Sequence, residues 1–246
     1  MTDPTASPAN AAPAIVASAA ERPTVVVCGL GPAGPDLVTG AVTAAVGRIA
    51  HRFVRTTRHP SAPVVAEAVS FDSLYERAES IDEVYAGIVE ALVAAAGEHG
   101  EVLYAVPGSP VVAERTVELL VADPRIAVEL VPALSFVDLA WVRLGIDPVE
   151  RGVRLVDGHR FAVEAAGERG PLLVGQCDDV DVLSEIKLAL GDTVDGAHHD
   201  AVGGAVAAEP TVVVLQRLGL PDEAIVEVPW HGLHRVVQPD HLTSIY

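Results

Sequence analysis

The chain has 246 residues and a formal net charge of −18 at pH 7, and half of its residues are hydrophobic although only 4% are aromatic. This length suffices for one large domain or two small ones with cores of their own. The charge argues against nucleic acid or an anionic membrane as a partner, because the sequence has neither a basic stripe nor a basic tail. No apolar run is long and clean enough to span a bilayer. The two cysteines, Cys28 and Cys177, are far apart and are expected to be small buried hydrophobic residues, which favours a cytoplasmic protein.

In chain order, a tail comes first and an alternation of strands and helices follows. Residues 1–22 are rich in Ala, Pro, Ser and Thr and are predicted to be disordered, with no secretory signal. Apolar runs predict the strands, and apolar residues at helical spacing predict the helices. The expected strands are 24–28, 52–56, 102–106, 127–131, 155–157, 171–176 and 211–216, and the expected helices are 39–50, 64–67, 81–97, 111–120, 137–144 and 180–190. A change of composition near residue 133 predicts an α/β fold of two subdomains, 23–133 and 134–246, with a ligand cleft between them.

Two glycine-proline turns follow directly on apolar strands of the first subdomain. One contains Gly29, Gly31 and Pro32, and the other is Pro107-Gly108-Ser109-Pro110. A buried strand that ends in Gly and Pro exposes backbone at the carboxyl edge of a sheet, where open α/β folds bind ligands. The cleft is therefore expected to be lined by Gly31, Gly108 and Ser135.

The first turn also has the G-x-G-x-x-G spacing of a dinucleotide-binding fold, through Gly29, Gly31 and Gly34. Two prolines interrupt its passage into a helix, and the better helix start is the capping residue Thr39. The acid expected about twenty residues on is absent from 53–60. An arginine there would suit a 2′-phosphate, so an NADP-binding oxidoreductase stays an alternative, as does a turn without any ligand.

Other polar groups give weaker indications. His198-His199-Asp200 invites a metal assignment, but adjacent ring side chains point apart on most backbones, and no metal is predicted. Ser109 as a nucleophile lacks a histidine and an acid at a recognisable spacing. Arg52, Arg55, Arg58 and His59 form the basic cluster of the sequence. Two interpretations of this cluster stay open: it binds an anionic substrate, or it pairs with surrounding acids.

Taken together, the motifs resemble those of the tetrapyrrole methylase superfamily, from Thr24 to Tyr246. The family's opening Val-x-x-Gly-x-Gly-Pro-Gly is matched by Val27–Gly34, and its Gly-Asp-Pro loop by Gly108-Ser109-Pro110. Within the superfamily, the chain resembles most the methylase-like N-terminal domain of MazG-fused pyrophosphohydrolases. Further residues that resemble that branch are Arg55-Thr56, His59-Pro60, Val174-Gly175-Gln176, and 242–246 as the linker before its MazG domain.

The resemblance implies a methyltransferase that uses S-adenosylmethionine and acts on a small-molecule acceptor that the sequence does not identify. The implied cofactor-binding residues are Gly108, Ser109, Pro110, Val111, Val112, Ser135, Phe136, Gln176, Cys177, Leu218 and Pro229, and the implied substrate-binding residues are Gly31, Pro32, Arg55 and His59. Ser109 stands where many members have aspartate, which puts methylation of a tetrapyrrole ring in question. An alternative is a non-catalytic S-adenosylmethionine-binding or regulatory domain of a MazG-type enzyme, because the sequence lacks the acidic helix pair that would bind Mg²⁺ for nucleotide cleavage.

A homodimer is also expected. The family commonly pairs, and the predicted helix 111–121 is apolar around most of its circumference, which is more than one core-facing stripe requires. A symmetric partner would bury the surplus face. The apolar residues concerned are Val111, Val112, Val117, Leu119, Leu120 and Val121.

Overall fold

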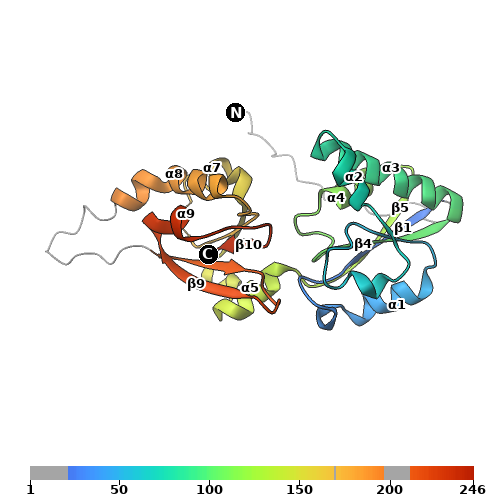
Figure 1. The fold of residues 1–246 in the computed structure, drawn as a ribbon, viewed down its shortest axis with the longest axis horizontal. Coiled ribbons are helices and arrows are strands. Elements are labelled where there is room, and N and C mark those ends of the chain that lie inside the picture. Colours follow the sequence, from blue (N-terminus) through green and yellow to red (C-terminus); the bar gives the residue numbers. More distant parts are fainter. Residues whose placement is uncertain (1–21, 169, 197–210) are drawn as a thin grey trace, which may run out of the picture.

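The protein has two lobes, each built on a five-stranded sheet, and the predicted α/β fold class is confirmed (Figure 1). The computed structural model describes residues 22–168, 170–196 and 211–246. The predicted tail, except Arg22, and the His198-His199-Asp200 motif lie outside these residues.

The first sheet is parallel throughout, with strand order β3-β2-β4-β1-β5. Its strands are β1 (Thr24–Gly29), β2 (Arg52–Val54), β3 (Val69–Ser70), β4 (Glu101–Val106) and β5 (Ala127–Val131). Residues 25–28 and 102–106 are fully buried, as expected for apolar runs covered on both faces. Dinucleotide-binding folds of the 3-2-1-4-5-6 order place β1 beside β2, whereas here β4 lies between them. The oxidoreductase alternative therefore lacks that sheet topology.

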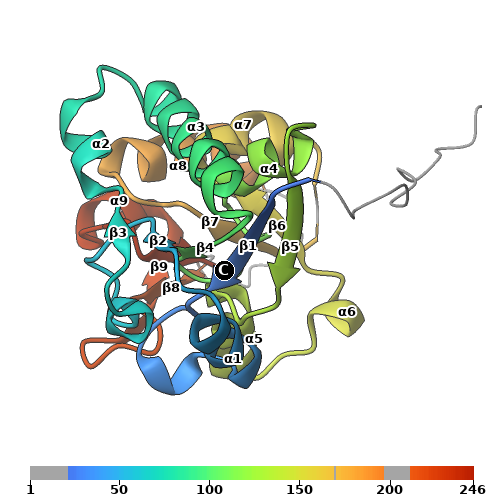
Figure 2. The same cartoon turned by 90° about the vertical axis from the view of Figure 1, so that its right-hand side faces the viewer.

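Helices cover both faces of this sheet (Figure 2). One face packs against α2 (Asp72–Arg77), α3 (Ile81–His99) and α4 (Arg115–Ala122), and the other against α1 (Gly40–Arg48) and the 3₁₀ turn η2 (Ala62–Val65); a 3₁₀ turn η1 (Pro35–Leu37) precedes α1. Ile88 and Leu92 of α3 are fully buried, which agrees with the predicted helical periodicity. Thr39 caps α1 as expected, because its Oγ1 accepts a hydrogen bond from the Val42 amide at 3.3 Å.

The second sheet is mixed, with order β6-β7-β10-β8-β9. Its strands are β6 (Arg154–Asp157), β7 (Leu172–Gly175), β8 (Thr211–Gln216), β9 (Ala224–Pro229) and β10 (Thr243–Ile245). Only β6 and β7 are parallel; the other neighbours are antiparallel. The remaining elements are α5 (Phe136–Leu144), α6 (Pro148–Arg151), η3 (Gly158–Arg160), α7 (Phe161–Glu164), α8 (Val180–Gly196), η4 (Trp230–Gly232) and α9 (Leu233–Val236). Leu139 and Ala140 of α5 pack in one cluster with Leu173 and Leu215, so α5 belongs to this sheet.

Several expected elements differ in the structure. The predicted helix 64–67 is the 3₁₀ turn η2, and the predicted helix 111–120 begins only at Arg115. Ala113 has a φ of 54°, which an α-helix does not accommodate, so Val111 and Val112 precede the helix. Residues 242–246 were expected to form a linker, but β10 lies inside the second sheet, between β7 and β8.

These differences remove part of the argument for a dimer. Val117 and Leu120 of α4 are buried in the core and Leu119 packs against it. Val121 is 58% exposed, and Val111 is exposed outside the helix. The helix therefore has an ordinary core-facing stripe rather than an apolar circumference.

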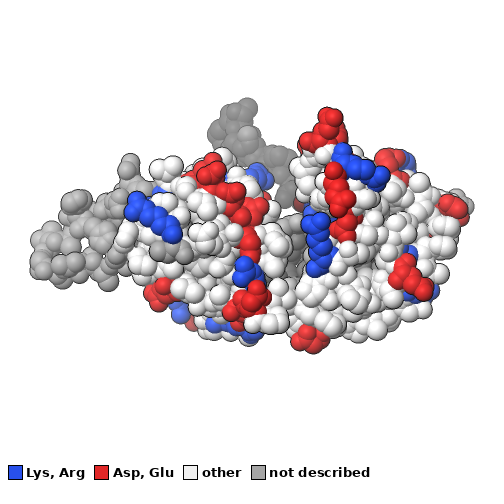
Figure 3. All heavy atoms as spheres, viewed as in Figure 1, with Lys and Arg blue, Asp and Glu red and all other residues white. Residues whose placement is uncertain are grey.

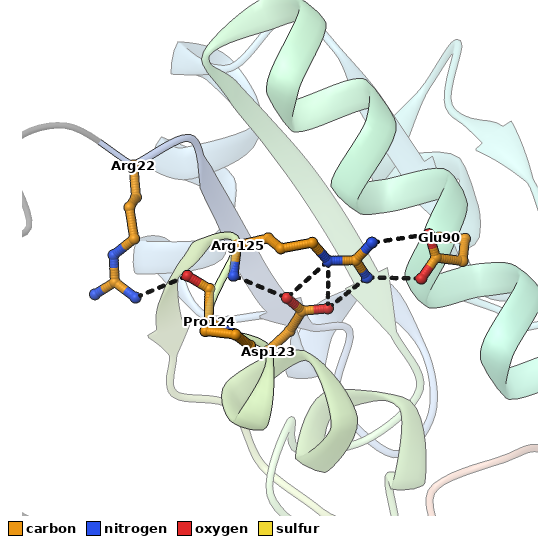
Figure 4. A network of polar contacts seen from close by, with 5 residues as sticks. All are labelled: Arg22, Glu90, Asp123, Pro124 and Arg125. Carbon is orange, nitrogen blue, oxygen red and sulfur yellow. Dashed lines mark hydrogen bonds and ion pairs between the residues drawn. The ribbon is translucent and has the colours of Figure 1, made fainter.

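Ion pairs lie near the amino end of the first sheet (Figure 4). The Arg125 guanidinium bridges Asp123, just after α4, and Glu90 of α3, with N–O distances of 2.6 Å to each. Arg22 donates to the Pro124 carbonyl at 3.4 Å. No helix in the described part of the chain has both the length and the apolar character needed to cross a membrane.

Candidate functional site

A cavity of about 320 Å³ lies where the carboxyl ends of β1, β2 and β4 meet the second lobe. The first lobe contributes Pro32, Arg55, His59, 107–109 and 112–114, and the second contributes Ser135, Phe136, Gln176, Arg217, Leu218 and 241–244. This volume is within the range of small-molecule sites, which hold roughly 300–1,000 Å³.

The two glycine-proline turns are hydrogen-bonded to each other at the edge of this cavity. The Gly31 amide donates to the Gly108 carbonyl at 3.2 Å, and the Gly108 amide donates to the Gly31 carbonyl at 2.8 Å. A Cβ on Gly29 would lie 2.3 Å from the Gly108 oxygen, so only glycine fits there. Gly108 has a φ of 64°, and a Cβ on it would meet no protein atom within 4 Å. The close approach of β1 and β4 therefore builds one continuous wall from two distant segments.

Most of the residues expected to bind the cofactor come together here. Gly108, Ser109, Val112, Ser135, Phe136, Gln176 and Leu218 all line the cavity. Four others do not. Pro110 is buried against Gly29, Val111 is 71% exposed, Cys177 is fully buried, and Pro229 is exposed at the end of β9. Burial raises the pKa of the Cys177 thiol, and that of Cys28, to about 12, so neither is a thiolate nucleophile.

Of the residues expected to bind substrate, Pro32, Arg55 and His59 line the cavity, whereas Gly31 is buried behind it in its pairing with Gly108. Burial lowers the pKa of His59, and a backbone hydrogen bond with Gly31 only partly offsets this. The ring Nδ1 accepts a hydrogen bond from the Ser61 amide at 3.2 Å. His59 is thus a neutral imidazole whose ring holds its own loop against the first turn.

The backbone amides expected to hold a cofactor already have protein partners. Those of Gly108, Val112, Ser135 and Cys177 donate to Gly31, Ser109, Asp138 and Thr243, respectively. Carbonyl oxygens keep a second lone pair, so the Gly108, Ser109 and Ser135 carbonyls remain able to accept from a ligand.

Besides Ser135, two largely buried serine residues line the cavity, one from each lobe. Ser109 is 7% exposed and Ser244 is 4% exposed, and neither hydroxyl forms a hydrogen bond within the described residues. Both hydroxyls are thus free to form hydrogen bonds with a ligand in the cavity. Ser244 was not expected at the site, because 242–246 was interpreted as a linker.

Three residues in the cavity wall have a backbone conformation that non-glycine residues rarely adopt. Ala113, Gln176 and Arg217 have φ values of 54°, 56° and 52°. Each such residue costs of order 1–3 kcal/mol, and such residues cluster at ligand sites. The sequence shows no signal for them, since none is glycine or asparagine.

An ion pair between the part-buried Arg55 and the buried Glu114 forms the polar end of the cavity wall in the first lobe. The Arg55 Nη1 lies 2.5 Å from Glu114 Oε2, with the two side chains 21% and 2% exposed. Glu114 Oε1 accepts from the Thr116 hydroxyl at 2.5 Å, and Arg55 Nε donates to the Tyr75 hydroxyl at 2.8 Å. Burial alone would lower the pKa of Arg55, but the charge of Glu114 and the contacts with Tyr75 and Tyr104 together outweigh it, so the pKa is raised. Of the two interpretations of the basic cluster, Arg55 therefore follows the second, in pairing with an acid.

Arg217 forms a second ion-pair group, on the opposite wall. Its guanidinium contacts Asp240 at 2.7 Å and Asp222 at 3.3 Å, and its amide donates to the Leu242 carbonyl. These contacts hold the β8 end against 240–242. Neither Arg217 nor Glu114 was identified from the sequence, because Asp240 and Arg55, which they pair with, lie 23 and 59 residues away along the chain.

Known proteins match this architecture. The family model of Tetrapyrrole (Corrin/Porphyrin) Methylases matches residues 24–233. The chain belongs to this family. The predicted resemblance to the superfamily is confirmed. Among curated relatives, it is 31% identical over 229 residues to the uncharacterized protein YabN of Bacillus subtilis (strain 168), covering 90% of this chain and 44% of that protein. The chain thus spans less than half the length of this relative.

Solved structures share the fold at low sequence identity. The uroporphyrin-III-C-methyltransferase of Thermus thermophilus superposes with a TM-score of 0.65 at 20% identity, covering 91% of each chain. A uroporphyrin-III C-methyltransferase from the same organism, complexed with S-adenosylhomocysteine, gives 0.61 at 17% identity, covering 90% of this chain and 96% of that one. A diphthine synthase gives 0.62 at 13% identity, with coverage of 90% and 88%.

Proposed function

We propose that the protein binds S-adenosylmethionine in the cavity between its lobes and transfers the methyl group to a small acceptor. The observation that carries this proposal is the pair of serine hydroxyls, of Ser109 and Ser244, which meet one cavity from two lobes and have no hydrogen-bond partner among the described residues. Seven of the residues that the family resemblance implied for the cofactor line the same cavity. The S-adenosylhomocysteine complex of a structural neighbour supports the choice of cofactor.

The residues present fit such a cofactor. Gly108 leaves open space where a side chain would stand, and Phe136 packs over Gly175, since a Cβ there would lie 2.9 Å from its ring. Carbonyl oxygens and serine hydroxyls suit the hydroxyl and amino groups of a nucleoside and an amino acid. S-adenosylmethionine supplies a methyl group already activated on a sulfonium. The chain itself has to bind the cofactor, orient the acceptor and exclude water.

Calorimetry with S-adenosylmethionine, S-adenosylhomocysteine and NADPH tests the proposal. We expect the first two to bind with one site per chain and NADPH to give no heat. Ser244→Ala is expected to weaken S-adenosylhomocysteine binding, whereas Thr211→Ala on the exposed start of β8 leaves it unchanged. Binding of NADPH without either sulfur compound would contradict the proposal.

The finer relationship, to the methylase-like domain of MazG-fused enzymes, stays a prediction. It is supported by Gly-Ser-Pro in place of Gly-Asp-Pro and by the Arg55-Thr56 and His59-Pro60 pairs. In that case the domain binds the cofactor and regulates an attached hydrolase. We expect no pyrophosphate release from nucleoside triphosphates by this chain with or without Mg²⁺; clear release after two orthogonal purification steps would contradict this.

We also propose a homodimer. The remaining support is exposed apolar surface, with Val121 at 58% and Leu130 of β5 at 40% exposed. Light scattering at micromolar concentration decides the matter: a mass near 25.5 kDa would show a monomer.

A further inference from the structure

One stretch of the cavity wall, residues 241–244, is held in place by Asp240, which lies behind the wall. All four residues of this stretch line the cavity, whereas Asp240 is not part of the lining. Ser244 is buried and already belongs to β10. Where Ser244 stands in the wall therefore depends on how the chain turns between Asp240 and β10.

Asp240 and Thr243 close this turn on each other. Asp240 Oδ1 accepts hydrogen bonds from the Leu242 amide at 2.8 Å and from the Thr243 hydroxyl at 3.2 Å. In the other direction, the Asp240 amide donates to Thr243 Oγ1 at 2.8 Å, and the Asp240 carbonyl accepts from the Thr243 amide at 2.9 Å. The short side chain of aspartate reaches the backbone two residues on and so defines a turn. One carboxylate oxygen thus fixes the turn that leads into β10.

The other carboxylate oxygen connects the turn to the end of β8. Asp240 Oδ2 lies 2.8 Å from Nε and 2.7 Å from Nη2 of Arg217, which itself lines the cavity. The Arg217 amide donates to the Leu242 carbonyl at 3.1 Å, and Arg217 has a φ of 52°. A non-glycine residue keeps such a conformation only where its surroundings impose it. The contacts with the turn supply that restraint.

The same turn also holds the part of the wall that follows β7. The Thr243 carbonyl accepts a hydrogen bond from the Cys177 amide at 3.1 Å. The residue before Cys177 is Gln176, which lines the cavity with a φ of 56°. Three stretches of the wall, at the ends of β7 and β8 and at the start of β10, therefore meet at the turn that Asp240 closes.

Charge pairing alone does not distinguish Asp240 from other acids near the cleft. Figure 3 shows basic side chains flanked by acidic ones on the edges of both lobes. Asp222 also contacts Arg217, at 3.3 Å, but its side chain is 63% exposed, compared with 25% for Asp240. Burial alone would raise the pKa of Asp240, but its hydrogen bonds and the charge of Arg217 outweigh this, so the pKa is lowered. What separates the two acids is the turn that Asp240 closes.

We propose that Asp240 is a positioning residue for the ligand site, which holds Ser244 and the turn at Gln176 in the cavity wall by closing the turn before β10. The inference rests on the proposed binding of S-adenosylmethionine in this cavity and deepens it. Because Asp240 lies outside the cavity lining, it acts through the backbone that it fixes. A site that is ordered before its ligand arrives avoids part of the cost of binding. Loss of the turn therefore lowers affinity even in a chain that stays folded.

Calorimetric titration of the full chain with S-adenosylhomocysteine tests three substitutions at this one position. Asp240→Ala removes every side-chain contact and is expected to weaken binding about tenfold or more. Asp240→Asn keeps an oxygen for the Leu242 amide and the Thr243 hydroxyl, so its affinity should stay within about threefold of wild type. Asp240→Glu keeps the charge, but its extra methylene moves the oxygens out of the turn, and it should lose about as much as alanine.

The matched control is Asp222→Ala, which removes the other carboxylate on Arg217. It is expected to change the affinity less than about twofold, because this pair is open to solvent. If Asp240→Glu binds like wild type while Asp240→Asn is as weak as Asp240→Ala, the charge matters and the turn does not, which overturns the proposal. Wild-type affinity of Asp240→Ala, with a lower unfolding midpoint in urea, would leave the residue a structural role alone and also overturn it.

Hydrogen exchange followed by mass spectrometry tests the positioning without any ligand. Peptides that contain 176–177 and 241–244 are expected to exchange about tenfold faster in Asp240→Ala than in wild type, and at the wild-type rate in Asp222→Ala. Unchanged exchange in Asp240→Ala would contradict the proposal. If that variant does not fold, the contrast between Asp240→Asn and Asp240→Glu decides. If the wild-type chain does not bind S-adenosylhomocysteine, the proposed function fails, and exchange alone decides the role of Asp240.

Discussion

The two ends of the first sheet place similar ion pairs in opposite surroundings. At the carboxyl end, the buried Glu114 pairs with the part-buried Arg55 beside a cavity whose wall holds three non-glycine residues with positive φ. At the amino end, Arg125 bridges Glu90 and Asp123, where Arg125 and Glu90 are open to solvent (Figure 4). Exposed pairs are screened by water, whereas buried charges depend wholly on their partners. The carboxyl end thus combines costly features that stability alone does not require, which marks it as the functional end.

The largest expected effect on the free energy of unfolding comes from the Arg55–Glu114 pair at the carboxyl end. Glu114→Ala leaves the part-buried Arg55 charge without its carboxylate. Removal of one partner of a fully buried pair typically costs about 3–5 kcal/mol, which is the upper bound for this loss of stability. Urea unfolding measures this, with Glu118→Ala on the exposed face of α4 as the control. The double variant Arg55→Met with Glu114→Leu should recover most of the loss. Equal midpoints for Glu114→Ala and Glu118→Ala would show that burial does not distinguish the two sites.

A pair of glycines with positive φ compares the two ends of the sheet. Gly108 has a φ of 64° and Gly100, after α3, a φ of 80°, and a Cβ on either would meet no atom within 4 Å. Alanine at either position is expected to cost about 1–2 kcal/mol, because a Cβ is disfavoured in the left-handed region. Only Gly108→Ala should weaken S-adenosylhomocysteine binding, since its methyl group enters the cavity. Equal calorimetric affinities for the two variants would remove the second turn from the site.

His59, at the carboxyl end of the first sheet, predicts that the stability of the protein depends on pH. Burial lowers its pKa in the folded state below the ordinary value near 6.5. As the pH falls below that value, the unfolded chain binds a proton that the folded chain does not, so stability decreases until the folded pKa is passed. His59→Asn should therefore flatten the fall in unfolding free energy between about pH 7 and pH 5. Parallel curves for variant and wild type would contradict the assignment.

The smallest expected effect is at the exposed end. Arg125→Gln breaks contacts to Asp123 and Glu90, but water and salt screen these charges in the wild-type protein. We expect its unfolding midpoint to match that of the wild type within the scatter of repeated urea titrations, and S-adenosylhomocysteine affinity to be unchanged. A loss as large as that of Glu114→Ala would show that the two ion-pair groups are equivalent after all.

Much of the first lobe was predictable because its signals are local. The apolar runs of β1 and β4 predict buried parallel strands, and α3 was expected at 81–97 and spans Ile81–His99. The turns containing Gly31 and Gly108 were expected at one sheet edge, and they are hydrogen-bonded to each other. The second lobe was less predictable, because β10 has only three residues and exists through its pairing with β7 and β8.

By itself, the sequence determined the α/β class, the family and the two turns that form the cavity wall. Buried strands and glycine turns depend on residues that are close together in the sequence. Only the tertiary structure decided which polar groups meet in the cleft. Arg55 and Glu114 are 59 residues apart, and Ser244 reaches the cavity through a strand of the second sheet. The start of α4 was also a tertiary outcome, because Ala113 takes a left-handed φ that neither helix propensity nor hydrophobic pattern predicts. Contacts between distant segments depend on how the two sheets pack, and no local pattern records that packing.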